Sequence, residues 1–475
     1  MTIRFGTDGW RAVIAETFTF ENVRLVSQAV ANHLLETTTT NHAEIVIGFD
    51  TRFLSDRFAA EVARVMAANG IIAHLARADS PTPAISYNIV HRQAAGGVMI
   101  TASHNPPRYN GFKVKAAYGG AASQRQTRSI QNQLTAVHER FGANLMDYNK
   151  ALEQGLIRRF DPAWPYYEHL TTNLIDMDII SNGELKVVVD SMYGSGRGVY
   201  GEILSRTRTR VRELHGEMNP GFGGLHPEPL GRNLRELITT VQNSNVHLGL
   251  ATDGDADRLG AVDEQGNFVD PHTIMSLAVR YLVEKRGMTG GIAKTISSTL
   301  MLNRLAKKYG LELYETPVGF DLIAHHMLTD DILLGGEESG GISIKGHIPE
   351  GDGILMGLLL MEIVAEAQVP LSELVADLQA QVGPTVYKRD DIRLNNPISK
   401  KEMVNRLVAS TPQNIIGEEV IKVDSYDGVK YHLADDSWLL IRPSGTEPVL
   451  RVYAESNSMK AVDGIIEAGR NLSGA

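Results

Sequence analysis

Apolar runs typical of buried strands alternate with helical patterns along most of the chain. Residues 45–49 form one such run, and the apolar positions that follow recur at helical spacing up to Gly70, a typical helix stop. Similar β-rich runs cover residues 185–190, just before a Gly-Ser-Gly turn, and residues 246–252. Strands that alternate with helices in this way predict α/β layers with parallel or mixed sheets.

Two breaks in this pattern divide the chain. Prolines interrupt the periodicity within residues 160–165, and a Gly-Pro-Thr sequence at residues 383–385 follows the helical pattern of residues 371–381. At roughly 150 residues per domain, a chain of 475 residues is expected to contain about three domains. The breaks therefore predict a first domain, a long middle part and a last domain.

The composition is that of a globular protein, with 43% hydrophobic and 21% charged residues. Because 56 acidic residues outnumber 46 Lys and Arg residues, the formal net charge is −10, which argues against nucleic acid and anionic membranes as partners. The absence of cysteine excludes disulfides and thiolate metal sites and favours a cytoplasmic location. No signal-peptide pattern opens the chain, and the most apolar run, residues 354–364, is too short to span a bilayer, so no membrane role is expected.

A Thr-Ala-Ser-His-Asn-Pro-Pro sequence follows the apolar residues 98–100 and places Ser103 just past the end of a predicted strand, where α/β proteins bind ligands. An ordinary Ser/Asn/Pro turn would read the same, and His104 alone would suit a structural role equally well. Lys113, ten residues after the serine, supplies a cation suited to a phosphorylated hydroxyl or an incoming phosphate.

Three carboxylates, Asp253, Asp255 and Asp257, alternate along the loop that leaves the strand of residues 246–252. They would repel one another strongly without a cation, so the spacing predicts a divalent metal. The spacing also fits an EF-hand, but Arg258 replaces the glycine that such a loop requires, and the preceding residues read as strand. Mg²⁺ with a phosphate oxygen completing its shell fits better.

Two further loops carry polar groups suited to a sugar phosphate. Glu337 and Ser339 are flanked by glycines, which permit the close approach of sugar hydroxyls, although a polar glycine-rich turn would read the same. The sequence Arg-Pro-Ser-Gly-Thr-Glu-Pro at residues 442–448 follows another predicted strand and suits a phosphate dianion, with a structural turn as the alternative. The chain lacks the P-loop pattern, which disfavours an NTPase.

These four motifs, together with Phe-Gly-Thr-Asp-Gly-Trp-Arg at residues 5–11, resemble those of the α-D-phosphohexomutase family, and they occur in the family's order over nearly the whole chain. The resemblance implies α/β architecture with four domains around a central cleft: three related α/β domains with mixed sheets and a smaller C-terminal α+β domain. The expected bounds are 1–145 with the phosphoserine loop, 160–257 with the metal loop, 258–380 with the sugar-binding loop and 385–475 with the phosphate-binding loop.

The resemblance also implies a role for each motif residue. Ser103 would carry the phosphoryl group, and Mg²⁺ would lie between its phosphate and Asp253, Asp255 and Asp257. Further groups at the reacting centre would be Arg11, His104, Lys113 and Arg258. The substrate-binding residues would be Glu337 and Ser339 for the sugar hydroxyls, and Arg442, Ser444, Gly445, Thr446 and Arg451 around the phosphate that is not being transferred.

The activity implied is a phosphohexomutase that interconverts hexose 1-phosphate and hexose 6-phosphate, glucose phosphate ahead of mannose phosphate, with hexose 1,6-bisphosphate as intermediate or activator. Asp321 stands where many relatives have Lys, and Gly341 where many have His, which leaves the general acid/base and the sugar preference open; Lys345 and His347 lie near enough in sequence to compensate. A synthase that releases the bisphosphate and a non-catalytic sugar-phosphate-binding protein remain as alternatives. The expected partners are small-molecule hexose phosphates, and the sequence carries no signal of oligomeric state.

Overall fold

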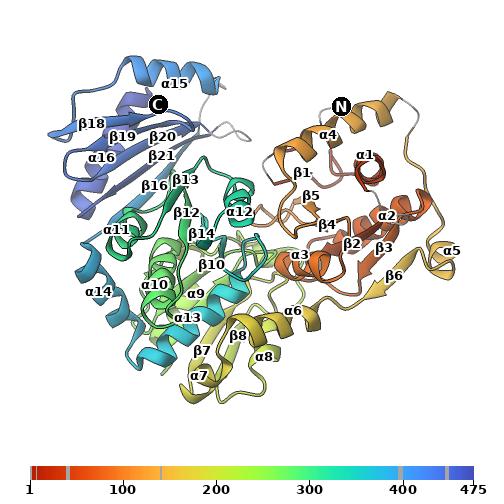
Figure 1. Cartoon of the computed structure of the whole chain (residues 1–475), viewed down its shortest axis with the longest axis horizontal. Coiled ribbons are helices and arrows are strands. Elements are labelled where there is room, and N and C mark those ends of the chain that lie inside the picture. Colours follow the sequence, from red (N-terminus) through yellow and green to blue (C-terminus); the bar gives the residue numbers. More distant parts are fainter. Residues whose placement is uncertain are drawn as a thin grey trace.

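The computed structural model describes residues 3–6, 8–38, 43–139, 142–393, 399–443 and 449–474. Four sheets follow one another along this part of the chain, each with its own helices (Figure 1). The first three sheets combine parallel and antiparallel pairs, and the fourth is antiparallel throughout. The expected fold class, three mixed α/β domains and a C-terminal α+β domain, is thereby confirmed.

The first sheet has the strand order β1-β5-β4-β2-β3-β6. Its strands are β1 (Trp10–Val13), β2 (Glu44–Phe49), β3 (Ile72–Ala76), β4 (Gly96–Ile100), β5 (Tyr109–Ala116) and β6 (Ile157–Phe160). Its helices are α1 (Phe20–Thr37), α2 (Ser55–Ala68), α3 (Thr82–His91), α4 (Gln124–Glu139) and α5 (Tyr148–Glu153). The strand predicted at residues 45–49 is β2, and the predicted helix before Gly70 is α2. Because β6 pairs with β3, this domain extends past residue 145, where the sequence placed its end.

The second sheet has the order β11-β10-β9-β7-β8. Its strands are β7 (Lys186–Asp190), β8 (Arg210–Leu214), β9 (Leu248–Thr252), β10 (Leu259–Asp263) and β11 (Phe268–Val269). Its helices are α6 (Ala163–His169), α7 (Met177–Asn182), α8 (Val199–Leu204) and α9 (Arg235–Gln242), with the short turns η1 (Leu170–Leu174), η2 (Phe222–Gly224) and η3 (Gly231–Asn233). The expected division after residue 257 would separate β9 from β10, which are hydrogen-bonded neighbours, so the second domain extends beyond it.

The third sheet has the order β13-β12-β14-β15. Its strands are β12 (Gly291–Thr295), β13 (Leu313–Thr316), β14 (Ile332–Gly336) and β15 (Ile342–Ile344). Its helices are α10 (Pro271–Glu284), α11 (Leu300–Tyr309), α12 (Phe320–Thr329), α13 (Gly353–Ala367) and α14 (Leu371–Val382). The helix predicted at residues 371–381 is α14.

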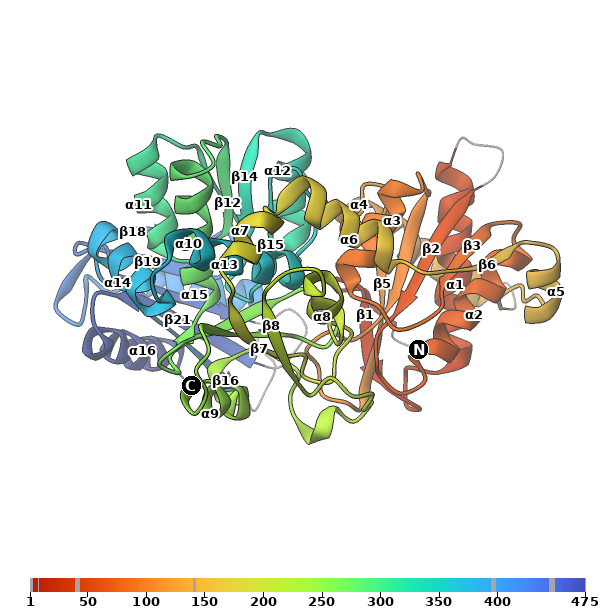
Figure 2. The same cartoon turned by 90° about the horizontal axis from the view of Figure 1, so that it is seen from below.

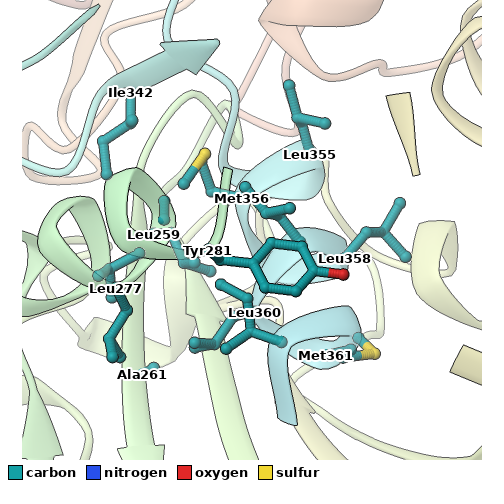
Figure 3. Packing of buried hydrophobic residues seen from close by; sticks show 14 of the residues in the cluster. Leu259, Ala261, Leu277, Tyr281, Ile342, Leu355, Met356, Leu358, Leu360 and Met361 are labelled. Atoms are coloured by element: carbon teal, nitrogen blue, oxygen red, sulfur yellow. The ribbon is translucent and has the colours of Figure 1, made fainter. Parts of the chain in front are cut away.

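Helix α13 joins the second and third domains into one core. Every residue from Gly353 to Ala365 is buried, because apolar side chains surround this helix on all sides. Figure 3 shows Leu355, Met356 and Leu358 of α13 close to Tyr281 of α10 and Leu259 of β10. The two middle domains therefore share one hydrophobic cluster, whereas the first and fourth have clusters of their own.

No single helix in the described ranges is long and apolar enough to cross a membrane. Helices α13 and α14 pass that test together on length and composition, but the chain bends by 88° between them.

The fourth sheet has the order β16-β21-β20-β19-β18-β17. Its strands are β16 (Val386–Arg393), β17 (Asn414–Ile415), β18 (Glu418–Asp424), β19 (Val429–Leu433), β20 (Trp438–Pro443) and β21 (Val449–Ser456), and its helices are α15 (Lys400–Ala409) and α16 (Met459–Ser473). The first and fourth domains lie at opposite ends of the molecule, with the two middle domains between them (Figures 1 and 2). The loops that carry the motifs therefore come from separate domains.

Candidate active site

Ser103 lies on the loop after β4, at the carboxyl end of a strand in the first sheet. It is buried, and its φ of +50° places it in the left-handed region that serine rarely adopts. Its N–H donates to Thr101 Oγ1 at 2.9 Å, and its Oγ donates to Asp253 Oδ2 at 2.7 Å. The first domain thus presents the serine hydroxyl directly to the acidic loop of the second domain.

The three aspartates lie on the turn between β9 and β10, which the antiparallel pair Thr252 and Leu259 closes. Their carboxylate oxygens lie within 4.8 Å of one another, and all three residues are buried. Burial, together with the charges of Asp257 and Asp255, raises the pKa of Asp253 well above its usual value. Asp255 Oδ1 is buried without a hydrogen-bond donor among the described residues. Oxygen ligands at this spacing, one of them unpartnered, fit a hard divalent cation.

Lys113, on β5, links the first domain to this acidic loop. Its Nζ lies 2.9 Å from Asp8, 2.9 Å from Asp255 and 2.8 Å from Asp257. Burial opposes the charged ammonium, but these carboxylates outweigh that effect and raise the pKa of Lys113 well above its usual value. The lysine is therefore a permanent cation within the cluster.

Arg11 and Arg258 lie at the edges of the same cluster. Arg11 Nη1 donates to Asn105 Oδ1 at 2.8 Å, and Arg258 Nε lies 3.8 Å from Asp257 Oδ1. His104 Nδ1 lies 3.4 Å from Ser103 Oγ. Burial and the neighbouring arginines lower the pKa of His104 well below its usual value, which favours the neutral ring.

The loop after β14 carries the two residues expected to hold a sugar. Glu337 Oε1 accepts the N–H of Gly319 at 3.0 Å, and burial followed by the charge of Glu338 raises the pKa of Glu337 to about 7. Ser339 Oγ is buried without a partner among the described residues. The N–H of Leu259 donates to the carbonyl of Gly340 at 3.2 Å, so this loop packs against the end of the metal loop.

The phosphate loop is described only at its two ends. Residues 444–448 lie outside the described part of the chain, and the expectations for Ser444, Gly445 and Thr446 fall there. Arg442, at the end of β20, is opposite Arg451 on β21, and its Nε donates to Asp427 Oδ2 at 2.8 Å. Asp427 also accepts the N–H of Val318 at 2.9 Å, which ties the fourth domain to the third.

Of the two departures from the family pattern, Asp321 lies at the border of the third and first domains, and Gly341 lies beside Asp257 of the metal loop. Asp321 lies in the first turn of α12 and is half-buried, and its burial and the charge of Asp8 raise its pKa. A Cβ on Gly341 would meet the Phe320 ring at 3.7 Å, and the carbonyl oxygen of Asp257 and the Cα of Gly351 at 3.9 Å. These are ordinary contact distances, so a small side chain would fit there without a clash.

Neither of the two residues suggested as compensation faces this border. Lys345 pairs with Asp331 and donates to the carbonyl of Thr289 at 3.0 Å, and His347 is bonded to His169 and Asp352. Their side chains are engaged within the second and third domains, so that interpretation was wrong.

The structure adds residues that the sequence did not single out. Thr82 donates to Asp255 Oδ2 at 2.6 Å, and Lys115 donates to Glu350 Oε2 at 2.7 Å. Asp8 belongs to the opening motif, but its pairing with Lys113 is visible only in three dimensions. No local pattern marks these groups, because their partners come from distant parts of the chain.

Four family signatures match successive parts of the chain. Their descriptions are phosphoglucomutase/phosphomannomutase alpha/beta/alpha domain I at residues 2–141, domain II at residues 165–266, domain III at residues 270–382, and the C-terminal domain at residues 402–471. The matches follow the order of the four sheets.

Relatives of similar length carry related names. A phosphoglucomutase/phosphomannomutase of Thermococcus kodakarensis is 29% identical over 469 residues, which cover 98% of both chains. A protein of Pyrococcus horikoshii with a phosphoglucosamine mutase name is 32% identical over 469 residues, covering 98% of this chain and 97% of the relative. A crystal structure from Thermus thermophilus with a phosphomannomutase name is 34% identical, covers 100% of both chains and has a TM-score of 0.87.

Proposed function

The chain belongs to the phosphoglucomutase/phosphomannomutase family of phosphohexomutases, and we propose on that premise that it interconverts hexose 1-phosphates and hexose 6-phosphates through a phosphoserine at Ser103. The observation that carries the proposal is the 2.7 Å contact of Ser103 Oγ with Asp253 inside a buried triad of carboxylates. A serine in that position can carry a phosphoryl group beside a divalent cation.

The proposed transfer runs in two balanced steps. First, the P–O bond to Ser103 Oγ breaks, and a new P–O bond forms to the free hydroxyl of the hexose monophosphate, whose proton is transferred to the released Ser103 Oγ. The hexose 1,6-bisphosphate turns over, the P–O bond to its other sugar oxygen breaks, and that phosphoryl group bonds to Ser103 Oγ. The proton of the serine hydroxyl passes to the released sugar oxygen. Neutral His104, whose Nδ1 lies 3.4 Å from Ser103 Oγ, is placed to hydrogen-bond that oxygen during the exchange.

The cations around Ser103 stabilise the charge on the phosphoryl oxygens during transfer. Lys113 supplies a buried ammonium from the first domain, and Arg11 and Arg258 supply guanidinium groups from the first and second. Asp253, Asp255 and Asp257 would hold Mg²⁺, which when bound would neutralise phosphoryl oxygens that the protein's own cations leave unpaired.

The remaining loops fix the sugar. Glu337 and Ser339 offer oxygen atoms for the sugar hydroxyls, and Ser339 Oγ is still unpartnered among the described residues. Arg442 and Arg451 at the two ends of the phosphate loop, with Ser444, Gly445 and Thr446 between them, hold the phosphate that is not being transferred. This division explains how one site accepts the sugar in two orientations, since either phosphate can occupy the remote loop.

The names of the relatives include glucose, mannose and glucosamine phosphates as sugars, and we propose glucose phosphate as the leading substrate of this chain with mannose phosphate as a further one. The decisive experiment follows glucose 1-phosphate and glucose 6-phosphate with and without added glucose 1,6-bisphosphate. Interconversion supports a mutase. No turnover under either condition would overturn the proposal in favour of a sugar-phosphate-binding protein.

One observation favours a second candidate, a hexose 1,6-bisphosphate synthase that releases the intermediate. Asp321 places a carboxylate near Asp8 at the border of the first and third domains, and Lys345 and His347 supply no compensating cation there. A negative group at this border repels a bisphosphate and favours its release. Free bisphosphate accumulating in step with turnover would support this second activity.

A further inference from the structure

Arg52 lies beneath the loop that carries Ser103, and only 3% of its surface is exposed. All five of its side-chain N–H groups have protein acceptors. Nε donates to Asp50 Oδ2 at 3.0 Å, and the other four N–H groups donate to main-chain carbonyl oxygens of the serine loop. These are Ser103 (2.5 Å) and Asn105 (2.6 Å) from Nη2, and Pro106 (2.9 Å) and Tyr109 (3.0 Å) from Nη1.

A second connection reaches the same loop from Asp50. Thr101 donates to Asp50 Oδ2 at 2.6 Å and accepts the N–H of Ser103 at 2.9 Å. The carbonyl and the N–H of Ser103 are therefore both held by the Asp50–Arg52 pair, directly or through one hydroxyl. This matters because the left-handed backbone of Ser103 is disfavoured for a non-glycine residue and persists only where its surroundings impose it.

The guanidinium also lies at the contact with the second domain. The Phe222 ring covers it, with Arg52 Cζ 4.8 Å from the ring centroid. A Cβ on Gly254 of the metal loop would lie 2.5 Å from the carbonyl oxygen of Ser103, so the two loops touch backbone to backbone at that oxygen. Arg52 Nη2 donates to the same oxygen, and it therefore supports the serine loop where the metal loop packs on it.

We propose that Arg52 is the residue that positions Ser103 for phosphoryl transfer, a proposal that rests on the phosphoserine function proposed above. Arg52 touches neither the sugar nor the phosphoryl group; it acts through the backbone of the loop. The planar guanidinium can bind four carbonyls at once, which the ammonium of lysine cannot. A displacement of about 1 Å between reacting groups can reduce a rate by about 100-fold, so loss of this support should slow transfer without weakening substrate binding.

The test is Arg52→Lys, which keeps the positive charge. We expect the single-turnover rate at which hexose 1,6-bisphosphate phosphorylates Ser103, followed by intact mass, to fall by roughly 10- to 100-fold, and kcat to fall with it. The KM for hexose monophosphate should change by less than about threefold, because the sugar and phosphate loops belong to other domains.

The matched control is Arg286→Lys, which alters a guanidinium bonded to Glu362 and to the carbonyl of Leu174 in the shared core of the middle domains. The control should lower the melting temperature and leave the transfer rate unchanged.

A wild-type transfer rate in folded Arg52→Lys would overturn the proposal. So would an equal loss of transfer rate in Arg286→Lys, because the effect would then follow from lowered stability. If Arg52→Lys does not fold, Asp50→Asn takes its place, since it leaves the guanidinium but removes the charge that orients Nε; a wild-type transfer rate in that variant would also overturn the proposal. Failure of the phosphoserine function itself is distinguishable, because wild-type protein would then carry no phosphate on Ser103.

Discussion

Ser103 Oγ of the first domain lies 2.7 Å from Asp253 Oδ2 of the second, and this contact joins the two motifs that are 150 residues apart in the chain. The serine and the metal triad are therefore parts of one site only while the two domains keep their relative position.

Ser103→Ala should keep the fold and lose mutase turnover by about 1,000-fold or more, because no covalent carrier remains. Steady-state assays with glucose 1-phosphate measure the loss, and circular dichroism checks the fold. Ser276→Ala removes another buried serine hydroxyl, one that donates to the carbonyl of His272 within α10, and should leave turnover unchanged. An active Ser103→Ala protein, or phosphate found on another residue by mass spectrometry, would contradict the assignment.

Asp255→Asn removes one of three clustered negative charges and should weaken divalent-cation binding by roughly 10-fold or more, with activity partly restored at high Mg²⁺. Isothermal titration with Mg²⁺ measures the affinity independently of turnover. Asp263→Asn, on the neighbouring strand β10, is the control, since Asp263 bonds to Gln265 and Asn267 and not to the triad. Full wild-type activity in excess chelator would refute the metal assignment.

Arg442→Lys keeps the charge and loses the fork of two N–H groups that suits a phosphate. The apparent affinity for hexose phosphates should fall by about 1–3 kcal/mol, while Ser103 remains phosphorylatable by the bisphosphate. Arg470→Lys tests the same replacement at an exposed ion pair with Asp390 in the same domain, and no change in KM is expected there. Unchanged KM and kcat in Arg442→Lys would remove this residue from the binding site.

Glu337→Gln should change how stability depends on pH. Burial and Glu338 raise the pKa of Glu337 to about 7 in the folded protein, against an ordinary value of 4.5, so the folded state binds the proton more tightly than the unfolded state. The wild-type protein should therefore lose stability relative to Glu337→Gln as pH rises from 4.5 to about 7. The loss should be on the order of 1 kcal/mol, because Glu337 is only half-buried and solvent reduces the effect. Urea midpoints at pH 5 and pH 8 measure the difference, and equal differences at both values would exclude titration of Glu337 in this range.

Asp321→Lys should retain the bisphosphate better than the wild-type protein, because a cation replaces a carboxylate at the border with the first domain. We expect free hexose 1,6-bisphosphate per turnover to fall by roughly threefold or more, as measured by anion-exchange chromatography. Glu312→Lys makes the same charge change at an exposed position of the same domain and serves as control. Equal release of the bisphosphate from the wild-type protein and Asp321→Lys would show that Asp321 does not control its release.

The strands and the positions of the loops that follow them could be predicted from the sequence because each motif is continuous. Residues 45–49 carry the apolar pattern of β2, and the aspartates after β9 lie on one short turn. The domain bounds were harder to predict. Strand β10 pairs with β9 across the metal loop, and nothing in the local sequence shows that the chain returns to the same sheet.

The supporting contacts could not be predicted, because they depend on which distant segments meet. Arg52 bonds to carbonyls more than 50 residues away, and main-chain oxygens carry no sequence signal. Lys345 and His347 show the opposite error, since both are close to the sugar loop in sequence and face Asp331 and Asp352 in the structure. Proximity along the chain indicated a role that the direction of the side chains excludes.

The ammonium of Lys113 neutralises negative charge in the acidic loop whether or not a divalent ion is bound there. It pairs with Asp8, Asp255 and Asp257, so removal of a divalent ion does not leave these carboxylates to repel one another unopposed. Lys113 thus supplies a countercharge from the protein itself, and we expect a divalent cation to bind and leave without unfolding. Chelation should therefore stop turnover reversibly, with activity returning on addition of Mg²⁺ and no refolding step between.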